Sequence, residues 1–323
     1  MLQAMAEQRR TMDFVVAVLN GLVGDYLHES GNALASPMCC IVDGKPLRLE
    51  RAQVAAALPD AGARLVILVH GVMGSERVWQ FADGSDYGSR LAQELGLTPL
   101  YLRYNSGRHI SDNGEALDAL LEELVAHWPV AVEEVTLICH SMGGLVARSA
   151  CHAAAASGHG WLARVRRAFY IGTPHLGAPL ERLGNVVTWA LRAIANPYTR
   201  IVADVGNLRS SGIKDLRYAN LHRADWEGAD ADALLEDRRH PVPLLPSIRH
   251  HLIAGTLSAS PLVSLLFGDA LVPVASATGR APRGDRGGPL PAHHVRVIPS
   301  VAHVALAHDE TVYAQLRAWM AEP

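Results

Sequence analysis

Ser141 stands where an apolar run changes abruptly into a helical pattern. The run Thr136–Cys139 leads directly into His140–Gly144, which contains two glycines. A serine at such a strand-to-helix corner projects its hydroxyl above the sheet, and the next backbone amide points at the same place. The pattern therefore predicts a nucleophile elbow. The alternative is that Ser141 only caps the first turn of the helix.

Cys139 departs from the usual Gly-x-Ser-x-Gly spacing of an elbow, in which a glycine stands at this position. The corner needs a small side chain there, so that the strand and the helix can pack closely. Cysteine is small, and Gly143 and Gly144 meet the rest of this need. We therefore expect the elbow to form despite the substitution.

A serine nucleophile needs a histidine as general base and a carboxylate that orients the histidine, and candidates for both follow in the chain. Asp269 comes after a predicted strand at 250–257, and His303 comes after a predicted strand at 295–299. Asp269 could instead cap a turn. His308 is the rival base, but it lies beside two acidic residues at a predicted helix start, where a solvated role is more natural.

An oxyanion hole is predicted upstream of the elbow. The continuous apolar run Arg64–Val69 indicates a strand buried on both faces of a parallel sheet, and a turn with two glycines follows it. Such a turn frees backbone N–H groups to face the elbow, so the amides of Val72 and Met142 are the predicted donors. The alternative is an ordinary strand-to-loop turn. We also expect the neighbouring residues to contact the substrate, namely His70, Gly71, Met73 and His140.

Five short segments together resemble an α/β-hydrolase of the lipase and esterase kind, related to the group that includes the GPI inositol-deacylases. These segments are Leu68–Gly71, Cys139–Gly144, Ile171–Gly177, Asp269–Pro273 and Ala302–His303. The resemblance extends over about residues 64–320, and the order of nucleophile, acid and histidine is also that of this superfamily. It implies a serine hydrolase that acts on acyl esters through a covalent acyl-enzyme. It does not imply which ester.

The expected elements alternate between strands and helices. This alternation predicts an α/β fold with a mostly parallel, doubly wound sheet and helices on both faces. Asp43-Gly44 predicts a hairpin that starts the sheet in an antiparallel way, and the apolar spacing through Phe14–Leu22 predicts a helix before it. Further strands are expected at 100–104 and 169–172, and further helices at 114–128 and 311–320. The predicted catalytic groups all fall at the carboxyl ends of strands, where open α/β sheets bind ligands.

The stretch 180–246 interrupts this alternation and is too long for a loop without structure of its own. We expect it to be a helical cap inserted into a hydrolase core formed by residues 64–179 and 247–323. Residues 1–63 are expected to pack on that core as a helix and a hairpin.

Two apolar residues of this insertion are candidates for substrate binding. Val187 and Trp189 lie in a predicted helix at 186–194, and in the functional interpretation they line an acyl pocket. The alternative is that they only pack the cap onto the core. The acidic run 225–236 is interpreted as a solvated surface.

Composition and charge narrow the function classes. A chain of 323 residues with 49% hydrophobic and 19% charged residues can bury one large core. The net charge of -3 and the absence of a basic block argue against a nucleic-acid partner. The four cysteines form no recognisable framework, so free thiols are expected. The adjacent histidine pairs at 250–251 and 293–294 lack metal-ligand spacing, so we expect no metal and no cofactor.

The N-terminal stretch 11–27 contains Asp13, Asn20 and Asp25, which makes it too polar for a secretory signal or a membrane span. We therefore expect a cytoplasmic protein that acts on a small-molecule or lipid ester without stable membrane insertion; interfacial contact and the oligomeric state are left open. The same catalytic groups could serve a thioesterase, or an acyltransferase that accepts an alcohol in place of water. A non-catalytic binding protein on the same scaffold is the remaining alternative.

Overall fold

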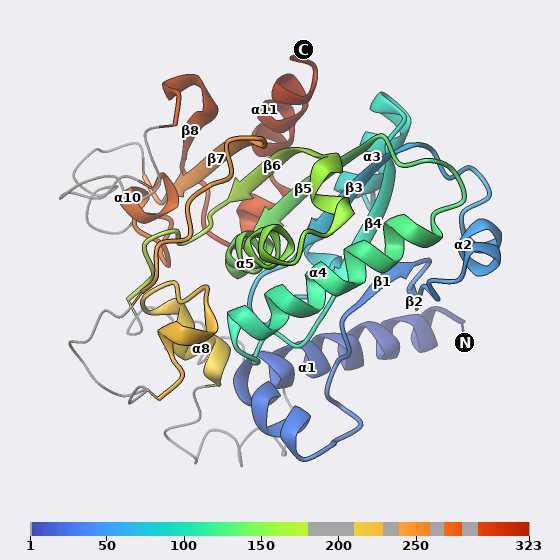
Figure 1. The fold of residues 1–323 in the computed structure, drawn as a ribbon, viewed down its shortest axis with the longest axis horizontal. Helices are drawn as coiled ribbons and strands as arrows, with labels where there is room; N and C mark the ends of the chain where they lie inside the picture. The colour runs from blue at the N-terminus through green and yellow to red at the C-terminus, as the bar shows by residue number, and fades with distance from the viewer. Residues whose placement is uncertain (1, 180–209, 229–238, 259–267, 280–289, 323) are drawn as a thin grey trace.

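The computed structural model describes residues 2–179, 210–228, 239–258, 268–279 and 290–322. Within them, one sheet of eight strands has the order β2-β1-β4-β3-β5-β6-β7-β8 (Figure 1). Strands β3 to β8 are parallel, whereas β1 pairs antiparallel with both β2 and β4. The strands are β1 (Cys39–Val42), β2 (Lys45–Pro46), β3 (Arg64–Val69), β4 (Thr98–Arg103), β5 (Glu134–His140), β6 (Val165–Ile171), β7 (Arg249–Thr256) and β8 (Val295–Pro299). The predicted mostly parallel sheet with an antiparallel hairpin is therefore confirmed.

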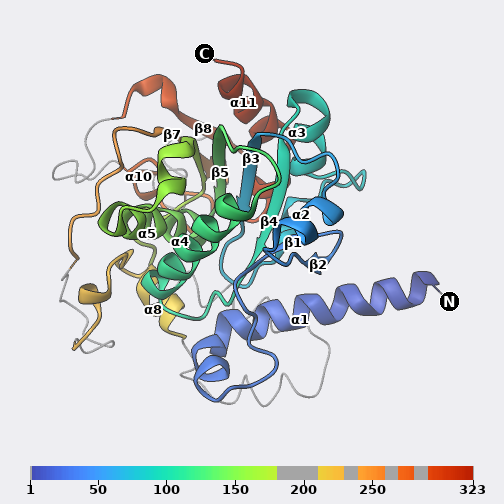
Figure 2. The same cartoon turned by 45° about the vertical axis from the view of Figure 1, so that its right-hand side comes forward.

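Helices cover both faces of the sheet (Figures 1 and 2). The α-helices are α1 (Leu2–Glu29), α2 (Arg51–Ala57), α3 (Tyr87–Leu95), α4 (Ile110–His127), α5 (Met142–Ser157), α8 (Ser211–Leu216), α10 (Val274–Ala277) and α11 (Glu310–Met320). Short 3₁₀ turns are η1 (Glu76–Trp79), η2 (Gly160–Arg164), η3 (Arg223–Asp225), η4 (Ala292–His294) and η5 (Ala305–His308). Helices α4 and α5 pack together on one face, and α3 and α11 contribute to the core of the other face.

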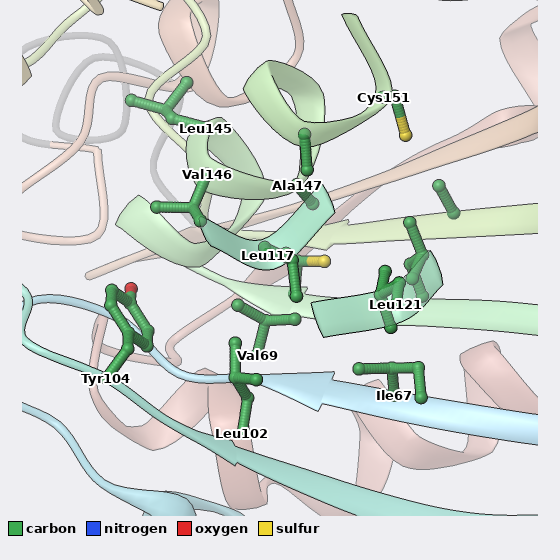
Figure 3. Packing of buried hydrophobic residues seen from close by; sticks show 14 of the residues in the cluster. Ile67, Val69, Leu102, Tyr104, Leu117, Leu121, Leu145, Val146, Ala147 and Cys151 are labelled. Carbon is green, nitrogen blue, oxygen red and sulfur yellow. The ribbon is translucent and has the colours of Figure 1, made fainter. Parts of the chain in front are cut away.

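Strand β3 shows why a continuous apolar run was needed. Leu65, Ile67 and Val69 face the cluster that contains α4 and α5, while Val66 and Leu68 face the cluster that contains α3 and α11. Figure 3 shows Ile67 and Val69 under the side chains of α4 and α5. Because side chains alternate between the two faces of a strand, a strand covered by helices on both sides must be apolar at every position.

Helix α4 begins at Ile110, four residues before the predicted start at 114. Its first turn contains no apolar periodicity that would reveal it. The cap comes from elsewhere in the chain, since a carboxylate oxygen of Asp215 accepts a hydrogen bond from the Ile110 amide at 2.9 Å. The same oxygen lies 2.9 Å from Nδ1 of His109. A helix N-terminus stabilised by a residue so distant in sequence gives no local signal.

Helix α1 is longer than the sequence indicated, and its backbone is kinked at Val23. It runs along the lower side of the body in the view of Figure 2. Two hydrogen bonds join its C-terminal half to the rest of the protein. The Gly21 carbonyl accepts from Ser210 Oγ at 2.6 Å, and the Gly24 carbonyl accepts from Asn105 Nδ2 at 2.7 Å. Asn105 follows β4, so α1 lies against the loops at the carboxyl ends of the strands.

Much of the predicted cap at 180–246, including Val187, Trp189 and the predicted helix at 186–194, lies outside the described residues. The described part contains α8 and the carboxylate of Asp225. The prediction that Asp225 lies on a solvated surface is wrong. Asp225 is 4% exposed rather than solvated. Its carboxylate accepts hydrogen bonds from the backbone amides of Leu221, His222 and His240. These amides replace the water that an exposed carboxylate would bind.

Candidate active site

Ser141 forms the corner between β5 and α5, as the elbow pattern predicts. Its backbone has φ 54° and ψ -126°, a conformation that residues other than glycine rarely adopt. Such a residue costs on the order of 1–3 kcal/mol and persists only where the surrounding structure imposes it. Here the Ser141 amide donates to the Ile171 carbonyl of β6 at 2.9 Å, which holds the corner to the neighbouring strand.

Gly143 and Gly144 allow α5 to pack closely on the sheet. A Cβ added at Gly143 would lie 2.4 Å from the His70 carbonyl oxygen, and one added at Gly144 would lie 2.1 Å from Thr173 Oγ1. Cys139 is itself fully buried in the core on β5. The close approach therefore depends on the two glycines after the serine, which explains why the elbow accommodates a cysteine before it.

The structure brings Ser141, His303 and Asp269 into one chain of hydrogen bonds. Ser141 Oγ lies 2.8 Å from His303 Nε2, and His303 Nδ1 lies 2.7 Å from Asp269 Oδ2. The carboxylate accepts from Nδ1–H, which leaves Nε2 as the acceptor for the serine hydroxyl. All three side chains are buried, with Asp269 at 0% exposure. The rival His308 instead contacts the Val78 carbonyl and takes no part in this chain.

Asp269 caps a turn, as the alternative interpretation expected, and its carboxylate also faces His303. Its Oδ1 accepts hydrogen bonds from the amides of Leu271 and Val272 at 3.1 and 2.8 Å, while Oδ2 faces the histidine. The backbone also joins the two residues, because the His303 amide donates to the Asp269 carbonyl at 3.0 Å. These contacts fix both the position and the orientation of the carboxylate.

His140 supports His303 from beneath. Its Nε2–H donates to the His303 carbonyl at 3.0 Å, and its Nδ1 has no partner among the described residues. Burial lowers the pKa of His140 to about 3, so the ring stays neutral at ordinary pH. A neutral ring adds no positive charge beside His303, whose ring centre lies 5.0 Å away.

The loop after β3 lies directly against Ser141. A Cβ added at Gly71 would be 2.8 Å from Ser141 Cβ. Met73 has a positive φ of 57°, and its amide donates to Ser106 Oγ at 3.0 Å. Within the described part of the chain, neither the Val72 amide nor the Met142 amide is engaged in a hydrogen bond. Among these residues, both predicted oxyanion donors therefore keep an unengaged N–H group.

A cavity of about 270 Å³ opens over Ser141 and His303. Four of the predicted substrate-binding or oxyanion residues line it: Gly71, Val72, Met73 and His140. His70 does not, contrary to the expectation of substrate contact. Its ring is fully buried, stacks on Tyr104 at 4.4 Å and donates from Nδ1 to the Gly71 carbonyl, so it supports the loop from inside.

The remaining walls of the cavity are mainly apolar, and several come from elements that were not expected to take part in the site. Helix α1 contributes Phe14, Ala17 and Val18, and α8 contributes Leu216. The apolar spacing of α1 predicted a buried face, but such spacing does not identify the surface that the face covers. Ser106, whose hydroxyl accepts from the Met73 amide, follows β4 and had no recognisable pattern around it.

Little else in the described residues points to another chemistry. No group of three or more His, Cys, Asp or Glu side chains there could hold a metal ion. The four cysteines are free thiols. Among the helices that the structure describes, none combines the length and the apolar character that a bilayer crossing requires.

Comparison with known proteins agrees with this fold. Residues 60–196 match the family described as PGAP1-like alpha/beta domain. The lipase BlEst2 from Bacillus licheniformis, in its propeptide form, superposes with a TM-score of 0.50 over 81% of this chain and 51% of that chain, at 19% identity. The protein has the α/β-hydrolase fold. The expected resemblance to α/β-hydrolases is thereby confirmed at the level of the fold.

Other solved structures are also similar to this α/β-hydrolase chain. The mature form of the same Bacillus licheniformis lipase gives a TM-score of 0.48 at 18% identity, over 80% of this chain and 90% of that chain. The esterase Pf2001 from Pyrococcus furiosus gives 0.47 at 14% identity, over 81% and 80% of the two chains. None of the curated proteins matches the sequence.

Proposed function

We propose that the protein is a serine hydrolase that cleaves carboxylic esters through an acyl-enzyme, with Ser141 as nucleophile, His303 as general base and Asp269 as its orienting acid. The observation that carries the proposal is the hydrogen-bonded chain Ser141–His303–Asp269, with distances of 2.8 and 2.7 Å, at the base of an apolar cavity. A buried carboxylate, a correctly oriented imidazole and a strained serine serve no evident purpose in packing.

In the first half of the reaction, His303 Nε2 takes the proton of Ser141 Oγ as that oxygen attacks the ester carbonyl. The imidazolium that forms is stabilised by Asp269, whose own position is held by two backbone amides. The negative charge that develops on the carbonyl oxygen faces the amides of Val72 and Met142. Fixed donors in a dry cavity stabilise such a charge strongly, because they need no reorganisation during the reaction.

Collapse of the tetrahedral intermediate then breaks the bond to the alcohol oxygen, which receives the proton from His303. Water, activated by the same histidine, attacks the remaining acyl-serine ester, and the carboxylic acid leaves. His303 takes a proton from this water and gives it to Ser141 Oγ as the acyl–oxygen bond breaks, so that the enzyme returns to its starting state. The charges in the site are consistent with this cycle, since His140 stays neutral beside the histidine that must become charged.

The test is hydrolysis of p-nitrophenyl esters from acetyl to palmitoyl by wild type and by Ser141→Ala. We expect turnover by wild type and a loss on the order of 10⁶-fold in kcat for the variant, as for other removed serine nucleophiles. Labelling by a fluorophosphonate should occur at Ser141 and vanish in the variant. Turnover that survived in Ser141→Ala would refute the assignment, and cleavage of thioesters alone would indicate a thioesterase with the same machinery.

A further inference from the structure

We infer that α1 forms the acyl side of the substrate site, and that Phe14 and Ala17 determine how long an acyl chain the enzyme accepts. This inference rests on the proposed function. Phe14, Ala17 and Val18 all line the cavity above Ser141. Their spacing of three and four residues places them on one face of the helix. The wall is thus a continuous strip of α1 rather than one side chain that reaches in.

The position of this strip is fixed by contacts with the oxyanion loop. Gly21 lies so close to that loop that an added Cβ would be 2.3 Å from Met73 Cγ and 2.9 Å from the Met73 amide nitrogen. Eight residues before Gly21, Asp13 accepts a hydrogen bond from Arg77 at 3.1 Å. The helix is therefore joined to the loop 71–77 on both sides of the strip.

A third attachment comes from α8. The Asp25 carboxylate accepts from both the amide and the hydroxyl of Ser211, at 2.8 and 2.9 Å. Leu216, at the other end of α8, also lines the cavity. Because α1 is attached at three places, its apolar strip forms a fixed wall of the cavity. A fixed wall limits the length of an acyl chain that can bind.

The chemistry of attack assigns this boundary to the acyl chain rather than to the alcohol. In the tetrahedral intermediate, the alcohol oxygen must lie near His303 Nε2 to receive its proton, and the oxyanion must face the Val72 and Met142 amides. The acyl chain takes the remaining direction, away from His303. The cavity residues beside His303 and Asp269 in the chain are Leu271, Val272 and Val304. Those residues would contact the alcohol, whereas α1, attached to the oxyanion loop, borders the acyl chain.

The experiment compares two substrate series on the full chain. In the acyl series, p-nitrophenyl esters run from acetyl to palmitoyl; in the alcohol series, butyrate esters run from methyl to octyl. The burial of each methylene is worth about fourfold in kcat/KM, which corresponds to ~0.8 kcal/mol. Each methylene that the added ring of Ala17→Phe excludes should lower kcat/KM for the longest accepted acyl chain about fourfold relative to acetyl, so the exclusion of two methylenes gives roughly sixteenfold. The alcohol series should keep its wild-type ratios.

Phe14→Ala supplies a test in the opposite direction, because it enlarges the cavity and should move the acyl optimum to longer chains. Met12→Phe is the matched control: it adds a phenyl ring to the same helix at a side chain that is 56% exposed and does not line the cavity. Both series should be unchanged in this control.

The outcomes separate the two proposals. If Ala17→Phe and Phe14→Ala alter the alcohol series instead of the acyl series, or alter neither, then α1 does not border the acyl chain and the inference is overturned while the proposed function stands. If wild type shows no ester cleavage that depends on Ser141, the proposed function fails, and the inference fails with it.

Discussion

Gly143→Ala offers a direct test of how closely α5 and β3 must approach for the site to work. A Cβ at this position would lie 2.4 Å from the His70 carbonyl oxygen and 2.5 Å from that of Val69. Real Cβ atoms essentially never come closer than 3.0 Å, so strand and helix must separate by at least 0.6 Å, the difference between 3.0 and 2.4 Å. Both obstacles are backbone atoms, which cannot rotate away.

This separation falls between the two predicted oxyanion donors, because β3 leads into Val72 and α5 begins with Met142. A misplacement on the order of 1 Å costs about 10²-fold in rate, and the loss of one oxyanion donor costs about 10²–10³-fold. We therefore expect kcat to fall about 10²-fold. Overpacking costs about 1–3 kcal/mol of stability, and the higher helix propensity of alanine offsets about 1 kcal/mol of it.

The assay measures kcat on p-nitrophenyl butyrate together with the thermal unfolding midpoint. Gly160→Ala is the matched control, since its added Cβ would meet nothing closer than Glu122 Oε1 at 3.7 Å. That control should keep wild-type kcat and stability. Activity of Gly143→Ala within about threefold of wild type would refute the reasoning, because it would mean that the oxyanion donors tolerate the separation.

Two further predictions concern titratable groups. Asp269→Asn should lower kcat on the order of 10⁴-fold with little change in unfolding temperature, because the amide oxygen can still accept from Leu271 and Val272 but the His303 tautomer is reversed; a pre-steady-state burst equal to that of wild type would contradict this. His251 is 1% exposed with both ring nitrogens unpartnered among the described residues, and burial lowers its pKa from 6.5 to about 3. Stability that it contributes above pH 6.5 is therefore lost as the pH falls towards 3, about 2 kcal/mol between pH 6.5 and 5. His251→Phe should reduce this acid sensitivity in thermal unfolding measured from pH 7.5 to 5, and an unchanged pH dependence would exclude His251 as its source.

The parts of the site that could be predicted are those with a local sequence signal. The elbow could be predicted from an apolar run followed by a serine and two glycines. Strand β3 could be predicted because its run of residues is continuously apolar. Asp269 and His303 could be placed because each follows a recognisable strand. Their meeting with Ser141 follows from the parallel sheet, which brings the carboxyl ends of its strands to one edge.

The features that could not be predicted depend on contacts between residues that are far apart in the sequence. The apolar face of α1 could be identified, but not the cavity that it borders. His70 was expected at the surface of the site because it stands in the turn, whereas stacking on Tyr104 draws its ring inward. Asp225 was expected in solvent because its neighbours are acidic, but three backbone amides from two segments bind it. In each case a partner far along the chain determines the environment.

The long span of the hydrogen-bonded chain has a consequence for how the protein is made. Ser141 and His303 are 162 positions apart in the sequence. The ion pair between Arg90 of α3 and Glu310 of α11 joins residues 220 positions apart. During synthesis, the elbow can leave the ribosome while the strand that precedes the histidine has not yet been translated. Under the proposed mechanism, the serine of a nascent chain therefore has no base to activate it. Its reactivity would arise only once the final strand has joined the sheet, which would protect incomplete chains from forming acyl adducts.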